Sequence, residues 1–273
     1  MLTYMNGSGR EMSASNGADL LIYDTSLGSA AQTIRCISWN IHRGKGNDGR
    51  RDTDRTMQVL RDEVWRDGTD ALFLQEADEE MPPHRGILDV ARIEAATGLR
   101  HVHADPSSRS SAHSHGFLGV VAYLHPEFMI EAVRLIDLAG LCPRGAVVID
   151  VDRMGRKLRF VATHLSLSQM LRVGQMRTIS QHLRRIDPRP VILCGDLNEW
   201  RPWGGFAFSK RVLGQGFTGP VRATFPVRRP ILPLDRVLTN APGRVDQFQV
   251  LDGPGIRMAS DHRPITARVR LAS

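Results

Sequence analysis

The segment Val-Ile-Leu-Cys-Gly-Asp-Leu-Asn-Glu-Trp (residues 191–200) joins a short apolar run to a group of polar residues. Val191–Cys194 has the length and the composition of a buried strand. Asp196 and Asn198 follow directly, where a strand ends and a rigid scaffold can direct side chains into a cleft. The segment therefore predicts a strand whose carboxyl end bears chemically active side chains.

The same arrangement recurs five times along the chain. The other polar groups that border apolar runs are Trp39-Asn40-Ile41-His42-Arg43-Gly44, Gln75-Glu76, Thr163-His164, Leu234-Asp235-Arg236 and Ser260-Asp261-His262-Arg263-Pro264. A single Asn, Asp or His in such a place is typical of a turn or a helix cap. Six groups in one chain, each at the border of an apolar run, predict one shared site instead.

Three of these residues offer the hard oxygen ligands that Mg²⁺ prefers in proteins. They are Asn40, Glu76 and Asp261. Mg²⁺ keeps several of its own waters, so few protein ligands are needed. We therefore expect a Mg²⁺ site, in which Mn²⁺ could replace Mg²⁺.

The remaining residues suit the hydrolysis of a phosphodiester. Attack by water needs a base, and either Asp196 or His262 could serve. Asn198 and His164 could donate hydrogen bonds to the oxygens of the developing phosphorane. An Asp235–His262 pair would fix the tautomer of the imidazole and raise its basicity. The choice between the two bases stays open at this point.

The composition allows a phosphate-bearing substrate but does not identify one. The 273 residues are 41% hydrophobic and 24% charged, with a net charge of +7. Only three of the 36 basic side chains are lysines. Arginine binds phosphate through paired donors better than lysine does, although a coding bias would give the same composition. Anionic partners are favoured.

The chain divides into a tail and one domain. Residues 1–33 are rich in Gly, Ser, Ala and Asn without periodicity, so we expect a loose N-terminal tail there and a single domain over residues 34–273. Apolar runs predict strands at 34–39, 71–74, 117–124, 146–151, 158–163, 191–194, 234–238 and 264–269. Helical spacing predicts a helix capped by Asp52 or Thr53, one at 87–96 closed by Gly98, and one at 168–185. This mixture predicts an α/β (α+β) protein with helices outside its sheets.

The cellular setting follows from what the sequence lacks. Three cysteines are too few and too scattered for a disulfide framework, and Cys36 and Cys194 lie in apolar runs. No apolar run approaches the ~18 residues of a membrane span. Residues 1–32 show no apolar core after a basic start, as a signal peptide would. The sequence therefore indicates a cytoplasmic protein without a transmembrane segment, and it leaves the oligomeric state open.

Taken in order, the motifs resemble those of the endonuclease/exonuclease/phosphatase superfamily, which includes DNase I-like nucleases, apurinic endonucleases, sphingomyelinases and inositol phosphate phosphatases. The motifs are WNIHRG (39–44), LFLQEAD (72–78), THLSL (163–167), CGDLNEW (194–200), LDRVL (234–238) and SDHRP (260–264). The match is to a small bacterial-type member and runs from about Ile34 to Leu271. It implies a DNase I-like four-layer sandwich, with two mixed β-sheets face to face and helices on both outer faces.

The resemblance also implies a role for each matched position. Asn40 and Glu76 would bind the divalent metal, and Asp261 would be a further carboxylate at the metal or behind it. Arg43, next to the metal ligands, is a candidate clamp for the substrate phosphate.

For the chemical step, the resemblance implies that Asp196 and Asn198 handle the nucleophile and the phosphate. His164 would contact a phosphate oxygen, and His262 would pair with Asp235. As in the reasoning from the residues alone, the base is either the Asp or the His.

Three functions remain in competition. A nuclease is favoured by the basic charge, whereas a phosphodiesterase for phospholipid headgroups or small phosphodiesters is favoured by loops that look too short to grip a duplex. Residues 223–233 would form an apolar and basic rim for the second function. We expect Trp200, Trp203, Phe206 and Phe208 to pack on the core rather than to stack on bases. The third function is a non-catalytic scaffold that binds an anion, which the intact set of candidate residues disfavours.

Overall fold

Burial along the strands shows how the sequence builds its sheets. The computed structural model describes residues 32–201 and 205–271. In β12 (Ile265–Leu271) buried and half-buried residues alternate, as in a strand with one face on the core. β2 (Ala71–Gln75) and β8 (Val191–Asp196) are buried along their whole length, as central strands covered on both faces are. The tail predicted over residues 1–33 lies, apart from its last two residues, outside the described part of the chain.

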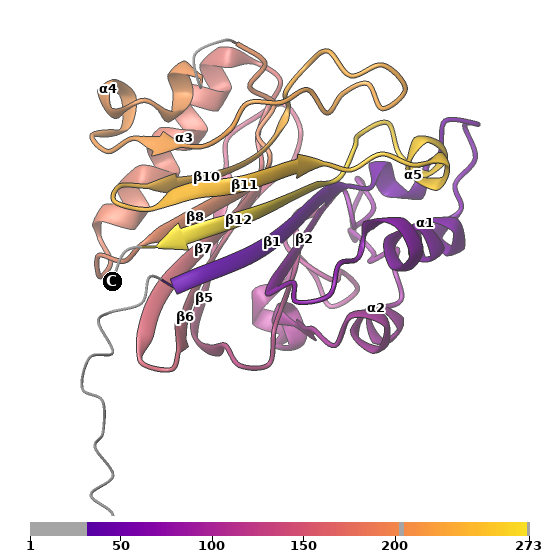
Figure 1. Ribbon diagram of the computed structural model, residues 1–273, viewed down its shortest axis with the longest axis horizontal. Helices are drawn as coiled ribbons and strands as arrows, with labels where there is room; N and C mark the ends of the chain where they lie inside the picture. The colour runs from indigo at the N-terminus through magenta and orange to yellow at the C-terminus, as the bar shows by residue number, and fades with distance from the viewer. Residues whose placement is uncertain (1–31, 202–204, 272–273) are drawn as a thin grey trace, which may run out of the picture. The chain divides into compact units, whose positions relative to one another are not determined.

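Two mixed sheets of six strands each result (Figure 1). The first has the order β11 (Arg244–Val250), β12, β1 (Gln32–Asn40), β2, β4 (Val121–Leu124) and β3 (Arg100–His101). The second has the order β5 (Met129–Leu138), β6 (Arg144–Arg153), β7 (Arg156–His164), β8, β10 (Asp235–Asn240) and β9 (Phe217–Thr218). Each sheet contains a parallel pair, β1–β2 in the first and β7–β8 in the second. All other pairs are antiparallel.

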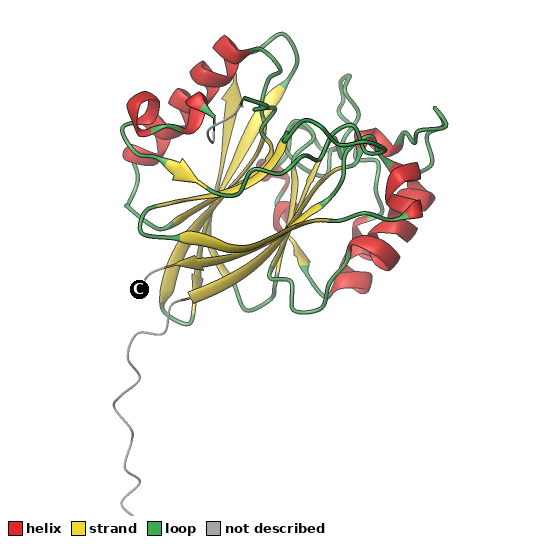
Figure 2. Ribbon diagram, turned by 45° about the horizontal axis from the view of Figure 1, so that its top comes forward, coloured by secondary structure: helices red, strands yellow, loops and turns green. Residues whose placement is uncertain are grey.

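Helices cover the outer face of each sheet (Figures 1 and 2). The helices on the first sheet are α1 (Thr53–Val59), which continues as the π-helical turn η2 (Leu60–Val64), α2 (Val90–Thr97) and α5 (Pro254–Ala259). Those on the second sheet are α3 (Gln169–Arg184) and α4 (Lys210–Leu213). Short 3-10 turns occur at His42–Gly44, Val102–Ala104, Pro106–Ser108 and Phe206–Phe208.

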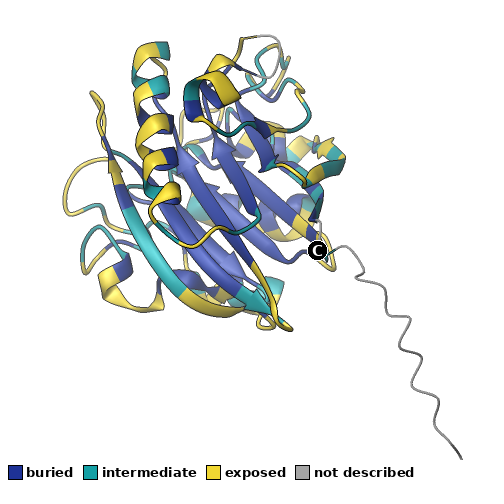
Figure 3. Ribbon diagram, turned by 90° about the vertical axis from the view of Figure 1, so that its left-hand side faces the viewer, coloured by how far each residue is buried: buried dark blue, intermediate teal, exposed yellow. Residues whose placement is uncertain are grey.

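Three apolar cores correspond to this layering. Phe73 and Phe160 belong to the core between the two sheets, and their ring centroids are 5.5 Å apart. Trp39 and Met57 belong to a second core, under α1, α2 and α5. Met176 belongs to the third core, under α3. Figure 3 shows the strands largely buried and the helices exposed on one side. The predicted four-layer sandwich is confirmed.

Most predicted elements are confirmed, with shifted ends. Asp52 caps α1 by accepting a hydrogen bond from the backbone N–H of Arg55, and Gly98 closes α2 with a φ of 70°. The strand predicted at 117–124 begins only at Val121, because Leu118 and Gly119 form a turn with positive φ. The helix predicted at 87–96 begins at 90. In the described part of the chain, no helix has the length and apolar character to cross a bilayer.

Candidate active site

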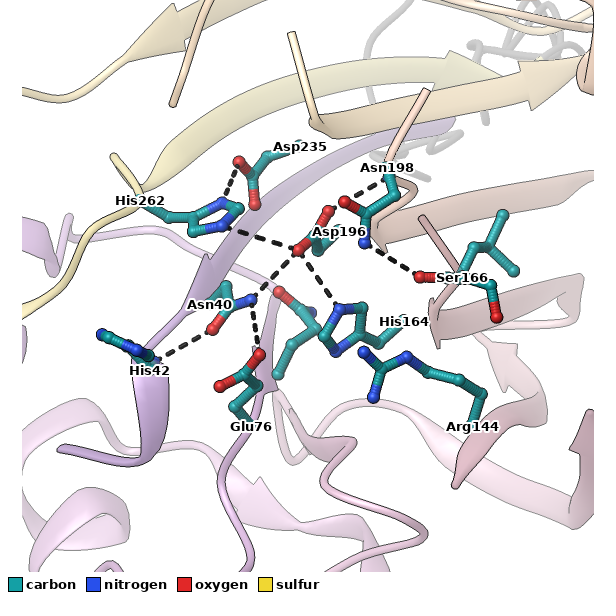
Figure 4. A network of polar contacts seen from close by, with 12 residues as sticks. Asn40, His42, Glu76, Arg144, His164, Ser166, Asp196, Asn198, Asp235 and His262 are labelled. Carbon is teal, nitrogen blue, oxygen red and sulfur yellow. Dashed lines mark hydrogen bonds and ion pairs between the residues drawn. The ribbon is translucent and has the colours of Figure 1, made fainter. Parts of the chain in front are cut away.

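The polar groups predicted from the sequence meet at one edge of the two sheets (Figure 4). Asn40 ends β1 and Glu76 follows β2, its parallel neighbour, in which Gln75 pairs with Asn40. His164 and Asp196 end the parallel strands β7 and β8 and are register partners. Parallel neighbours end at the same edge of a sheet, so the two pairs bring their side chains together.

The backbone at this edge depends on a glycine. A Cβ at residue 195 would lie 1.9 Å from the carbonyl oxygen of Thr163, so only Gly195 lets the ends of β7 and β8 approach this closely. Asn198 follows with a φ of 50°, a conformation that asparagine tolerates better than most residues do. Its side-chain amide donates a hydrogen bond to the carbonyl of Leu165 at 2.9 Å. The turn after β8 is thereby held against the end of β7.

Asp196 lies at the centre of the site and is 1% exposed. Its Oδ2 accepts a hydrogen bond from Nδ2 of Asn40 at 3.0 Å. The same oxygen lies 3.3 Å from Nε2 of His164 and 3.7 Å from Nε2 of His262. Its Oδ1 accepts from the backbone N–H of Asn198 at 3.1 Å. Burial raises the pKa of Asp196 to about 6, against the opposing effect of His262.

His262 has a carboxylate oxygen on each side of its ring. Nδ1 donates to Oδ2 of Asp235 at 2.8 Å, and Nε2 faces Asp196. Burial disfavours the charged ring, but Asp235 and then Asp196 outweigh burial and raise the pKa of His262 to about 10. Asp235 is itself fixed by the hydroxyl of Thr224, which donates to Oδ2 at 2.6 Å. The aromatic ring of Phe225 lies against His262, with a centroid distance of 4.9 Å.

His164 differs in charge from His262 although both approach the same oxygen. Burial lowers the pKa of His164 well below its ordinary value, and the positive charges of Arg144, His262 and Arg43 lower it further. At neutral pH the site therefore contains one neutral and one protonated imidazole around Asp196.

Two residues of this site were missed by the sequence analysis. Arg144 begins β6 and lies beside His164 (Figure 4). Thr224 lies eleven residues before its partner Asp235. Neither belongs to one of the six motifs. One signal could have identified Arg144, because it lies just before the strand predicted at 146–151. At strand ends, however, the prediction considered residues that can bind a metal or transfer a proton, and arginine does neither.

The three proposed metal ligands are joined through His42. Nδ2 of Asn40 lies 3.5 Å from Oε1 of Glu76, and Oδ1 of Asn40 accepts from the backbone N–H of His42 at 2.9 Å. Nδ1 of His42 lies 3.5 Å from Oδ1 of Asp261. Arg43, predicted to clamp phosphate, is paired with Oε2 of Glu76 at 2.6 Å. The structure thus brings Asn40 and Glu76 into contact and places Asp261 behind His42.

The donor set fits a hard divalent cation. It offers two carboxylates and one amide oxygen, which are the ligand types of Mg²⁺. Oδ1 of Asp261 is buried and, among the described residues, has no hydrogen-bond donor. A cation would be a suitable partner for this oxygen, because the side chain of Asp261 is otherwise 32% exposed. The ion pair between Arg43 and Glu76 supplies a positive charge for the neighbouring carboxylate.

A second group could hold a metal on distance alone. Donor atoms of Asp196, Asp235 and His262 all lie within 4.8 Å of one another. Metal ligation requires a neutral imidazole with a free nitrogen, however. Both ring nitrogens of His262 face carboxylates, and its raised pKa keeps it protonated. This group is better suited to proton and charge chemistry than to metal binding.

Comparison with known proteins agrees with the fold and with the extent of the site. The model of the Endonuclease/Exonuclease/phosphatase family matches residues 37–262, from before Asn40 to His262. The uncharacterised protein YbhP of Escherichia coli (strain K12) is 26% identical over 260 residues, which cover 88% of this chain and 97% of that protein. An endonuclease/exonuclease/phosphatase from Bacteroides vulgatus aligns with a TM-score of 0.65 at 16% identity, over 88% of this chain and 99% of that one. D. rerio TDP2, complexed with single-strand DNA product, aligns with a TM-score of 0.61 at 16% identity, over 87% of this chain and 98% of that one. Since the family model spans most of the sequence and every candidate site residue from Asn40 to His262, this chain belongs to the endonuclease/exonuclease/phosphatase family.

Proposed function

We propose that the protein is a divalent-metal-dependent phosphodiesterase that hydrolyses its substrate by in-line attack of water. Members of its family are in general hydrolases of phosphoester bonds. The observation that supports the proposal most strongly is the single oxygen of a buried Asp196 that meets an amide and two imidazoles in different charge states. A merely structural carboxylate would not need three such partners.

Asp196 is the base in this proposal. Its raised pKa keeps it strong enough to take a proton from water while it stays ionised above about pH 6. His262 cannot take this proton, because it already donates at Nδ1 and faces a carboxylate at Nε2. The geometry therefore favours Asp196 over His262.

His262 instead contributes charge. Held as an imidazolium by Asp235, it lies beside the base and can donate a hydrogen bond to the phosphorane oxygens as negative charge develops there. Thr224 and Asp235 fix its position before the substrate arrives. The preorganised positive charge then costs no rearrangement during the reaction.

The other side chains bind phosphate and hold the metal. Arg144 and neutral His164, which lie side by side, would contact the nonbridging oxygens. Asn40, Glu76 and Asp261 would hold Mg²⁺ or Mn²⁺, which when bound neutralises phosphate charge and favours the leaving of the ester oxygen. Arg43 would then be released from Glu76.

Two substrate classes are compatible with this site, a nucleic acid and a phospholipid or small phosphodiester. The presence of DNA product in D. rerio TDP2 supports the first class for a protein of the same fold. We also infer that the protein works in a reducing cytoplasm, since Cys36 and Cys194 are buried free thiols. A non-catalytic scaffold is disfavoured, because the charge pattern around Asp196 has no use in simple anion binding.

The test is hydrolysis of a panel of diesters with Mg²⁺, Mn²⁺ or EDTA. The panel contains plasmid DNA, a single-stranded oligonucleotide, phospholipid vesicles and bis-p-nitrophenyl phosphate. Asp196→Asn keeps the shape of the side chain, so it should abolish turnover while the melting temperature stays close to that of the wild type. Equal turnover in the wild type and Asp196→Asn, or turnover that persists in EDTA, would refute the proposal.

A further inference from the structure

Large apolar side chains are exposed in several segments of the chain. These segments adjoin the strands at the active-site edge, and Figure 2 shows the loops of this edge in green. These segments are residues 139–143, 165–170, 199–208 without the undescribed 202–204, and 221–233. We call the following six side chains the apolar rim: Leu141 (96% exposed), Leu167 (73%), Met170 (85%), Trp200 (50%), Phe206 (51%) and Ile231 (69%).

The rim includes two residues that were expected to pack on the core. Phe208 does so and is 1% exposed, but Trp200 and Phe206 face solvent. The 3-10 turn Phe206–Phe208 turns Ala207 and Phe208 inward and leaves Phe206 outside. Trp203, the other aromatic of this stretch, lies outside the described residues.

The rim segments are held in place by buried polar side chains. Gln175 donates to the carbonyl of Ala139 and accepts from the backbone N–H of Ser166, each at 2.9 Å. Arg172 donates to the carbonyl of Ser166 at 2.9 Å and lies 3.5 Å from the carboxylate of Glu199. Three of the four segments are therefore linked into one surface rather than being independent loops.

The fourth segment is joined to the catalytic residues themselves. Phe225 lies against His262, and the backbone N–H of Val227 donates to the carbonyl of Asp261 at 2.7 Å. Phe225 and Leu232 form an isolated bridge, so the chain between them, which includes Ile231, makes a hairpin. The hairpin that carries the exposed Ile231 is thus anchored at the site through Phe225 and Val227.

Two of these segments, 199–208 and 221–233, expose positive charge, whereas residues 139–143 and 165–170 contain no charged side chain. Residues 200–234 contain no Asp or Glu, and the nearby Glu199 is fully buried. Exposed arginines interleave with the apolar residues, namely Arg201, Arg222, Arg228 and Arg229. By contrast, the loop after β2, on the other side of the site, carries the half-buried Glu79 and the exposed Glu80. The apolar rim and its arginines form a polarised surface.

We propose that this surface docks on an anionic phospholipid bilayer, so that the proposed phosphodiesterase site faces diesters at the membrane surface. Exposed aliphatic side chains interleaved with arginine match the acyl boundary and the anionic headgroups of such a surface. A nucleic acid would require aromatic stacking platforms, and four of the six rim residues are aliphatic. The proposal deepens the function above and rests on it only for the chemistry, because docking needs no turnover.

The experiment measures partition of the full chain between buffer and vesicles of phosphatidylcholine with or without phosphatidylglycerol, by cosedimentation. The rim variant is Leu167→Ser with Met170→Ser. Its matched control is Met129→Ser with Met154→Ser, which removes exposed apolar side chains (63% and 87%) at the opposite end of the strands. A charge variant, Arg228→Glu with Arg229→Glu, tests the electrostatic part.

We expect the wild type and the matched control to bind the anionic vesicles and to lose binding as salt rises. The rim variant should bind the vesicles at least about tenfold more weakly than the wild type. The reason is that burial of each apolar side chain in the bilayer contributes a factor of about ten to the binding constant. The charge variant should lose its preference for phosphatidylglycerol. Hydrolysis of bis-p-nitrophenyl phosphate, a soluble substrate, should be unchanged in all three variants.

Equal vesicle binding by the rim variant and its control would overturn docking, even where soluble turnover is intact. Docking would also be overturned if the rim variant bound a fluorescent single-stranded oligonucleotide more weakly while its vesicle binding stayed unchanged. That outcome would assign the surface to nucleic acid. Rim-dependent vesicle binding without any soluble turnover would uphold docking and refute the phosphodiesterase function. The two proposals therefore fail separately.

Discussion

Replacing Asp235 by Asn tests whether His262 acts as an imidazolium or as a base. The substitution keeps the size of a fully buried side chain and an oxygen to accept from Nδ1 of His262, but it removes the charge. If charge on the ring matters, the variant loses activity where the ring becomes neutral. If the neutral ring is the base, the variant gains a larger active fraction at the same pH.

The expected size of the effect follows from the pKa of His262. Its rise from 6.5 to about 10 corresponds to roughly 5 kcal/mol in favour of the imidazolium. Burial opposes this rise, and Asp235 makes the largest favourable contribution, so its loss should lower the pKa of the ring back towards its ordinary value. Loss of one charged donor at a developing phosphorane then lowers kcat roughly a hundredfold at about pH 8.

The sign of the pH dependence distinguishes the two roles. In the wild type, activity should rise through about pH 6 as Asp196 ionises and stay level to about pH 9. In Asp235→Asn the ring is protonated only at low pH, so activity should be highest near pH 6 and fall above about pH 7. The base is ionised near pH 6 in this variant, because the protonated ring of His262 still lowers the pKa of Asp196 there and Asp235 no longer raises it.

The assay is hydrolysis of bis-p-nitrophenyl phosphate with saturating Mg²⁺, together with an NMR titration of the labelled histidines. Asp246→Asn is the control, since this carboxylate pairs with Arg268 on the first sheet. A variant profile that rises with pH in parallel with the wild type would refute the imidazolium role. Activity of the variant above that of the wild type near neutral pH would restore His262 as the base.

Two further predictions concern metal binding and folding. At a Mg²⁺ concentration about ten times its dissociation constant, binding should stabilise the wild type by roughly 1.4 kcal/mol. In a thermal-shift measurement Glu76→Gln should lose most of this gain. Arg43→Gln should keep it, because Arg43 competes with the metal for the carboxylate of Glu76. Persistence of the full shift in Glu76→Gln would place the metal elsewhere. Asp150→Asn should lower the free energy of unfolding, measured in urea, by about 3–5 kcal/mol, because Arg159, 1% exposed, would be left without its buried carboxylate partner. A loss of stability no larger than that of Asp246→Asn would contradict this prediction.

The candidate site was predictable because its residues obey a local rule. Asn40, His164 and Asp196 each stand at the end of an apolar strand, and an apolar run next to a polar residue is visible in any single sequence. Arg144 and Thr224 obey no such rule. They reach the site through sheet pairing and through a hairpin, and neither feature has a period or a spacing that the sequence displays.

The charge states of His164 and His262 could not be predicted from the sequence either. The raised pKa of His262 and the lowered pKa of His164 arise because both rings are buried, one between two carboxylates and the other near two arginines. A histidine after a strand looks the same in either case. The choice between Asp196 and His262 as base therefore depends on the distances between His262 and its two carboxylate neighbours.

Among the strands, those at sheet edges were missed. β5 is exposed or half-buried along most of its length, and β11 alternates irregularly around a register shift between Val245 and Gln247. Edge strands lack the continuous apolar runs of central ones. The error at 117–124 has another cause. Gly119 turns the chain so closely against Glu76 that a Cβ there would lie 3.4 Å from the Cα of Glu76, and the turn replaces the first half of the predicted strand.

The topology explains why six motifs far apart in sequence form one site. Each sheet has one parallel pair near its centre, and the carboxyl ends of both pairs point to the same edge. Antiparallel neighbours begin where these strands end, so Asp235 starts β10 opposite Asp196, and His262 precedes β12 beside β1. Most of the candidate side chains are therefore positioned at or next to strand ends, and the connecting segments can carry other surfaces. In the two proposals this division of tasks lets the apolar rim bind the membrane surface while Asp196 acts as the base, so that each role can be changed without the other.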